Sequence, residues 1–155
     1  MCVIMLPERD KGIPFDDLEA ACVTNPDGYG IAIADRGKIE LIKSFDKKGT
    51  NPDKLAKLLE PLRKEDIMVH LRYCTAGEKD LGNCHPFPVL NKKEHGTDIV
   101  FTHNGTFHGY DEIDKQRSDT WHMNELIFKK LFERSAKVLD PSELLDDPFI
   151  QEIVE

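Results

Sequence analysis

Residues 2–6 of this chain read Cys-Val-Ile-Met-Leu and follow the initiator Met1 directly. An apolar run of this length is typical of a short buried β-strand. The strand therefore begins almost at the N-terminus, and Cys2 stands at its start. A small second residue such as Cys2 permits removal of Met1, which would leave a free α-amine beside the thiol.

A free α-amine on Cys2 would have a pKa of about 7.7–8.0, which suits a general base at neutral pH. Nucleophile and base can then belong to one residue. On this segment alone, the plainer interpretation is a small residue buried in a strand. The other motifs of the chain are needed to distinguish a nucleophile from a buried strand residue.

Outward from this strand, the sequence predicts further elements of both kinds. Residues 29–34 and 38–44 are β-prone runs joined by Asp35-Arg36-Gly37, a hairpin signal. Asn51 is expected to cap a helix that starts at Pro52. The apolar face of this helix consists of Leu55, Leu58, Leu59 and Leu62.

The second half predicts two short strands, at residues 67–71 and 99–102, with a long loop over residues 74–97 between them. Ser118 is expected to cap a helix, and Pro141 and Pro148 to begin two more helical segments. Strands first and helices later indicate an α+β fold rather than a doubly wound parallel sheet. The expected buried face of the Ser118 helix is Met123, Leu126, Ile127 and Leu131.

The bulk composition limits the class of protein. The 155 residues suggest one domain over residues 1–155, with 39% hydrophobic and 32% charged residues. A net charge of −8 argues against nucleic acid as a partner. The apolar stretches are too short to span a membrane and no signal peptide is recognisable, so we expect a cytoplasmic protein. Four cysteines could form two disulfides, but a reducing cytosol favours free thiols.

Three further segments carry groups that could take part in catalysis or in substrate binding. Arg72, at the end of a predicted strand, can offer two parallel donors to a carboxylate, or form a surface ion pair. Asn104 and Gly105 can direct two N–H donors at one oxygen, as an oxyanion hole requires, or form an ordinary turn. Asp119 can bind an ammonium group, or complement the dipole of its helix.

The order and spacing of these segments favour the functional interpretations. Cys2 is followed by Asn-Pro-Asp-Gly-Tyr-Gly at residues 25–30, His-Leu-Arg-Tyr at 70–73 and Asn-Cys-His-Pro-Phe at 83–87. His-Asn-Gly at 103–105 and Ser-Asp-Thr at 118–120 complete the series. This arrangement resembles the class II glutamine amidotransferase domain, an N-terminal-nucleophile hydrolase, from Cys2 to about Asp119.

The resemblance implies a role for each matching residue. Cys2 would be the nucleophile, Asn104 and Gly105 the oxyanion hole, and Asp119 the ligand of the substrate α-ammonium. The α-carboxylate would be bound by Arg72, with Tyr73, Thr75 and His85 in the same pocket. The implied reaction is hydrolysis of the side-chain amide of L-glutamine through a γ-glutamyl thioester, with no metal and no organic cofactor.

The chain departs from the family pattern in two places. The usual Pro-Asp-Gly-Trp-Gly contains Tyr29 here, and the usual Ala-Thr-His-Gly is replaced by Cys-Thr-Ala-Gly at residues 74–77. The second change removes a histidine and adds a thiol near the site. It affects how the substrate is positioned more than the class of reaction.

The family fold is a sandwich of two antiparallel sheets between helices, with layers in the order αββα. After Ser118 the sequence predicts helices only, so we expect the last strands of the second sheet to be missing. The open edge or face would be covered by a partner subunit, as in self-association, or by residues beyond this sequence. A synthetase or acceptor partner would use the ammonia. No nucleic acid or membrane partner is expected.

Three other functions remain open. Cys74, Cys84, His85 and His103 could bind a metal, although their spacing fits no closed zinc pattern. The fold could serve as a binding module without turnover. It could also cleave an amide other than glutamine, although Arg72 and Asp119 together favour an amino acid with both α-groups free.

Overall fold

Two antiparallel sheets form the centre of the computed structural model, which describes residues 1–110, 113–137 and 143. The first has the strand order β1-β4-β2-β3, and the second pairs β5 with β6. The strands are β1 (Val3–Met5), β2 (Tyr29–Asp35), β3 (Lys38–Ser44), β4 (Asp66–Leu71), β5 (Phe87–Leu90) and β6 (Ile99–Phe101). The helices are α1 (Phe15–Thr24), α2 (Pro52–Leu59), α3 (Lys92–His95), α4 (Asp119–Met123) and α5 (Lys129–Ser135), with short turns η1 (Glu60–Leu62), η2 (Leu81–Asn83) and the π-helical η3 (Asn124–Phe128).

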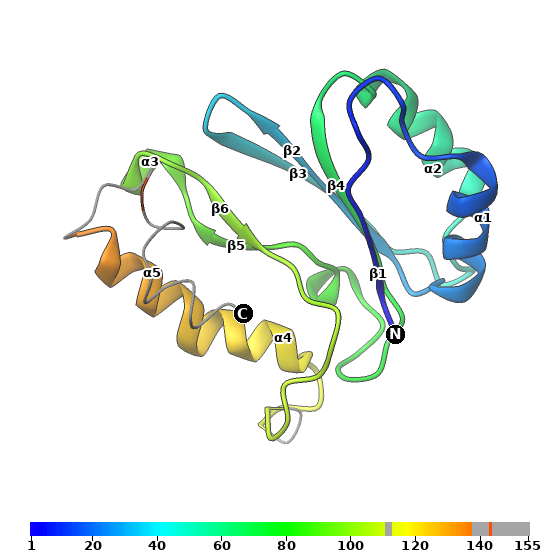
Figure 1. Ribbon diagram of the computed structural model, residues 1–155. Helices are drawn as coiled ribbons and strands as arrows, with labels where there is room; N and C mark the ends of the chain where they lie inside the picture. Colours follow the sequence, from blue (N-terminus) through cyan, green and yellow to red (C-terminus); the bar gives the residue numbers. More distant parts are fainter. Residues whose placement is uncertain (111–112, 138–142, 144–155) are drawn as a thin grey trace.

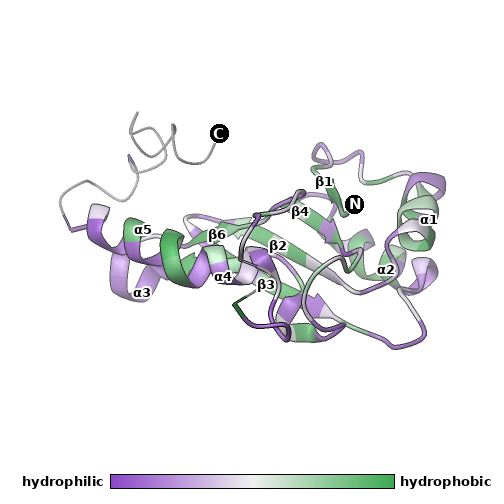
Figure 2. Ribbon diagram, turned by 90° about the horizontal axis from the view of Figure 1, so that it is seen from below, coloured by the Kyte–Doolittle hydropathy of each residue, from purple (hydrophilic) through white to green (hydrophobic). Residues whose placement is uncertain are grey.

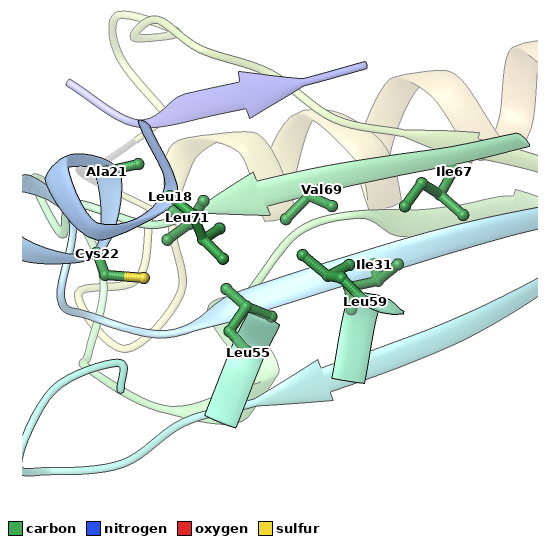
Figure 3. Packing of buried hydrophobic residues seen from close by; sticks show 9 residues of the cluster. All are labelled: Leu18, Ala21, Cys22, Ile31, Leu55, Leu59, Ile67, Val69 and Leu71. Atoms are coloured by element: carbon green, nitrogen blue, oxygen red, sulfur yellow. The ribbon is translucent and has the colours of Figure 1, made fainter. Parts of the chain in front are cut away.

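Helices α1 and α2 cover one face of the first sheet and form its core. Figure 3 shows side chains of both helices meeting those of β2 and β4. Leucines 55 and 59 of α2 are buried, as the helical spacing predicts. The Asn51 side chain accepts a hydrogen bond from the backbone N–H of Lys54, so the predicted cap of α2 is confirmed. The core comprises Leu18, Ala21, Cys22, Ile31, Leu55, Leu59, Ile67, Val69 and Leu71.

The second sheet lies against the opposite face of the first. Gly30 is required at this contact, because a Cβ there would collide with the backbone carbonyl oxygen of His85. Lys43 of β3 lies 4.7 Å from the centroid of the Phe87 ring of β5. The second sheet thus contacts the first on the side away from α1 and α2, and α4 and α5 lie beside the second sheet (Figure 1).

The α4–η3–α5 helix covers the outer face of the second sheet. Phe128 and Phe132 pack with Val89 and Leu90 of β5, and Phe101 of β6 lies 4.5 Å from Phe128 between ring centroids. Figure 2 shows hydrophobic residues along the central strands and on this helix, and hydrophilic residues on α3. Among the described residues, no helix combines the length and apolar character needed for a bilayer span.

Two expectations from the sequence were wrong. The long loop predicted over residues 74–97, which contain the turn signals Gly77, Gly82, Asn91 and Gly96, includes β5 and α3. Pro88 lacks an N–H donor, but within the described residues β5 pairs with β6 alone and so tolerates it. The expected buried face of the last helix is wrong in part: Met123 and Leu131 pack against the core of the second sheet, but Leu126 and Ile127 are 39% and 38% exposed. Phe128, which was not expected, is buried. Phe128 faces Phe101 of β6, and burial of this pair of rings stabilises the observed orientation of the helix.

The prediction that helices follow Ser118 holds over the described residues 118–137, and the Ser118 side chain caps α4 by accepting from the Trp121 N–H. Up to residue 137 the second sheet has two strands. The predicted helical segments at Pro141 and Pro148 lie outside the described residues. All four cysteines are free thiols.

Candidate active site

Pairing between β1 and β4 brings Cys2 to the centre of the predicted site. Val3 lies opposite Leu71 in the antiparallel register, so Cys2 comes next to Arg72 and Tyr73. The Cys2 Sγ lies 3.4 Å from the backbone nitrogen and 3.5 Å from the backbone oxygen of Tyr73. A nucleophile candidate and the strand end that carries Arg72 are thus held together by the sheet itself.

Most of the predicted site residues line one small cleft. Its lining includes seven of the eight: Cys2, Arg72, Tyr73, Thr75, His85, Gly105 and Asp119. Asn104 is the exception, since its side chain is exposed and is not part of the lining. Four residues to which the sequence assigned no role in this pocket complete it: Ala76, His103, Ser118 and Thr120. All four adjoin motif residues, which is the signal that could have identified them.

Arg72 is a buried cation at one side of the cleft. Its side chain is bound by backbone carbonyls, with Nη1 2.9 Å from the oxygen of Glu78 and Nη2 2.9 Å from that of Ala76. Nη2 also lies 3.3 Å from the Cys74 Sγ. The residue is 3% exposed, and no carboxylate among the described residues pairs with it. Because a buried charge is costly without a partner, this arrangement suits an anionic ligand group.

Asp119 is a buried anion that lines the same cleft. It is the first residue of α4 and is 5% exposed. Its Oδ2 accepts a hydrogen bond of 2.7 Å from the Phe107 N–H, and its Oδ1 one of 3.4 Å from the Thr120 hydroxyl. Within residues 1–110, 113–137 and 143 no cationic side chain pairs with it. It therefore complements Arg72 with the opposite charge.

The Cys2 thiol requires a base to react at neutral pH. Burial raises its pKa, while the hydrogen bond from the Tyr73 backbone and the charge of Arg72 act in the opposite direction. The protonated thiol therefore predominates at neutral pH, so its proton must be removed before it can attack. Met1 is 82% exposed, which leaves the bond before Cys2 accessible to processing.

Two histidines, His85 and His103, line the cleft, and His70 packs against His85. The rings of His70 and His85 are 4.3 Å apart between centroids, and the His103 backbone N–H donates to Nδ1 of His85 at 3.4 Å. Burial lowers the pKa of His70 to about 4 and that of His85 well below its usual range. Both rings are therefore neutral at neutral pH and carry no charge into the cleft.

The buried His70 predicts a specific loss of stability in acid. Its pKa is about 4 in the folded chain and about 6.5 when unfolded, so the unfolded chain binds the proton more tightly. We expect the free energy of unfolding to fall by about 3 kcal/mol from this residue as the pH drops from 6.5 through 4. Urea titrations at several pH values measure this change.

A His70→Leu variant provides the control, because both ring nitrogens of His70 are buried without a hydrogen-bond partner. The variant should unfold with a shallower dependence on pH, and His108→Asn, an exposed histidine, should behave as wild type. An unchanged pH dependence in His70→Leu would contradict the assignment.

Other features of the molecule are weaker candidates for a functional site. Within the described part of the chain, no three His, Cys, Asp or Glu residues are placed to hold a metal ion. A larger cavity of about 200 Å³ lies between α1, α2 and residues 7–13, but it is lined by no cysteine, serine, threonine or histidine. The cleft around Cys2 encloses only about 20 Å³, room for one water molecule.

Comparison with known proteins identifies the same family as the order of the sequence motifs. The sequence model of the family Glutamine amidotransferases class-II matches residues 13–136, which include every site residue except Cys2. A segment of 92 residues is 32% identical to an uncharacterized protein of Methanocaldococcus jannaschii. That segment covers 58% of this chain and 24% of the relative, so the chain spans about a quarter of the length of this relative. On the extent of the family match, the chain belongs to the class II glutamine amidotransferases.

Proposed function

We propose that the protein hydrolyses the side-chain amide of L-glutamine, with Cys2 as an N-terminal nucleophile. The observation that carries this proposal is the pair of buried, opposite charges in one cleft with a thiol. Arg72 would bind the α-carboxylate and Asp119 the α-ammonium, so a free amino acid would supply the partner that each charge lacks. The contact between two antiparallel sheets, with helices beside each of them, supports an N-terminal-nucleophile sandwich.

The reaction needs only groups of this chain and one water molecule. Once Met1 is removed, the α-amine of Cys2 takes the thiol proton, and the sulfur attacks the amide carbon of glutamine. The tetrahedral oxyanion would be stabilised by N–H groups of Gly105 and Asn104. The amine then passes the proton to the leaving nitrogen, which departs as ammonia and leaves a γ-glutamyl thioester. Water hydrolyses this thioester to glutamate and restores the thiol.

The direct test is ammonia release from glutamine by the processed protein. Cys2→Ala should abolish it, because the nucleophile is removed. Cys22→Ala provides the matched control, since this thiol is buried in the core between α1 and the first sheet. An inactive wild-type protein, or full activity in Cys2→Ala, would reject the proposal.

Asn104→Ala should lower kcat about 10²–10³-fold, as expected when one oxyanion donor is lost. The side chain of Asn104 is exposed in the structure, so it would have to turn toward the oxyanion when glutamine binds. KM should change little, because this contact forms mainly in the transition state. Steady-state kinetics measure both constants. An unchanged kcat in a folded variant would show that residues 103–105 form an ordinary turn with no role in the oxyanion hole.

A further inference from the structure

Asn83 lies outside the cleft lining but contacts both segments that present the buried charges. It is 0% exposed and follows the 74–82 segment. Its Nδ2 donates to the backbone oxygens of Glu78 at 3.1 Å and Gln116 at 2.8 Å. Its Oδ1 accepts from the Ser118 N–H at 2.8 Å. One side-chain amide thus joins two backbone segments that are more than 30 residues apart.

Each end of this connection leads to one of the buried charges. The Glu78 oxygen that Asn83 binds also accepts the hydrogen bond from Nη1 of Arg72. The backbone N–H of Ser118 donates a hydrogen bond to Asn83. Ser118 caps α4 and directly precedes Asp119. Arg72 and Asp119 are therefore linked through Asn83 by a short series of hydrogen bonds.

The same two segments also approach closely elsewhere, so their separation is tightly constrained. Gly77 has a φ of +73°, and a Cβ there would lie 2.6 Å from the Ser118 nitrogen. The Glu78 N–H donates to the Gln116 oxygen at 3.0 Å. Because the backbones touch at Gly77, a change in the Asn83 bonds would shift one segment relative to the other.

We propose that Asn83 is a positioning residue that sets the separation between Arg72 and Asp119, and so selects substrates carrying both α-groups. This inference rests on the proposed function of the cleft. Asn83 touches no reacting atom; it acts through the two residues that would bind the α-carboxylate and the α-ammonium. A substrate with only one of these groups does not depend on the separation.

The test compares Asn83→Ala and Asn83→Asp with wild type, using glutamine and its des-amino analogue, which keeps the carboxylate and the side-chain amide. Asn83→Asp keeps the size of the side chain but loses both donors of Nδ2. We expect KM for glutamine to rise at least about tenfold in either variant, because misplaced binding groups lose affinity steeply. kcat should stay close to wild type, and KM for the des-amino analogue should rise far less.

Asn124→Ala is the matched control, because Asn124 is also 0% exposed and its Nδ2 donates to a backbone oxygen, that of Pro88. It should lower the melting temperature as the Asn83 variants do, and leave KM unchanged. The positioning role is overturned if the Asn83 variants match this control in KM, or if both substrates are affected equally. Wild-type protein that releases no ammonia would instead overturn the proposed function together with this inference.

Discussion

Protein that has lost Met1 is expected to hydrolyse glutamine, and protein that retains any residue before Cys2 is expected to be inactive. With Met1 attached, the nitrogen of Cys2 is a peptide amide and cannot accept a proton at neutral pH. Burial already raises the pKa of the thiol, so loss of the base leaves little thiolate to attack.

Intact-mass spectrometry paired with ammonia release tests both parts of this prediction on one sample. A variant with a residue that blocks processing, inserted between Met1 and Cys2, should carry the blocked mass and show no activity. Its melting temperature should match wild type, because Met1 is exposed and lies outside the core. Full activity in a sample that retains Met1 would refute the amine mechanism and leave His85 or His103 as the base to examine.

Arg72→Ala is expected to weaken glutamine binding by about 2–5 kcal/mol, the usual loss when one partner of a buried charge pair is truncated. The α-carboxylate is bound equally in the ground state and the transition state, so KM should rise while kcat changes much less. Steady-state kinetics separate the two constants. The effect is large because Arg72 is the buried cation of the cleft lining and is 3% exposed.

Arg72 also binds the carbonyls of Ala76 and Glu78, so part of the loss could come from a loosened segment. Alkylation of Cys2 by iodoacetamide, which carries no α-groups, reports on that loosening. Its rate should stay near wild type in Arg72→Ala if the arginine mainly binds substrate. Arg72→Lys should recover only part of the affinity, since an ammonium cannot offer two parallel donors. A normal KM in Arg72→Ala would show that the residue is structural.

The sequence predicted most elements whose cause is local. Asn51 followed by Pro52 satisfies the free N–H groups at a helix start without help from the rest of the chain, and α2 begins there. The hairpin of β2 and β3 likewise follows from two β-prone runs around Asp35-Arg36-Gly37. Strand β5 was missed because it has only four residues and turn signals such as Gly82 and Asn91 lie on both sides of it. The burial of Phe128 in place of Leu126 and Ile127 depends on contacts with Phe101 of β6, which helical spacing alone does not reveal.

By itself, the sequence determined the class of protein, through the order of its motifs, and identified Cys2, Arg72 and Asp119 as the residues to examine. Only the tertiary structure decided how they act together. It joined Cys2 to Tyr73 across 71 positions, buried Arg72 and Asp119 without partners among the described residues, and left Asn104 outside the cleft lining. It also gave Asn83 its three contacts. Burial and hydrogen-bond partners depend on segments far apart in the chain, so they are fixed only when the sheets and helices pack.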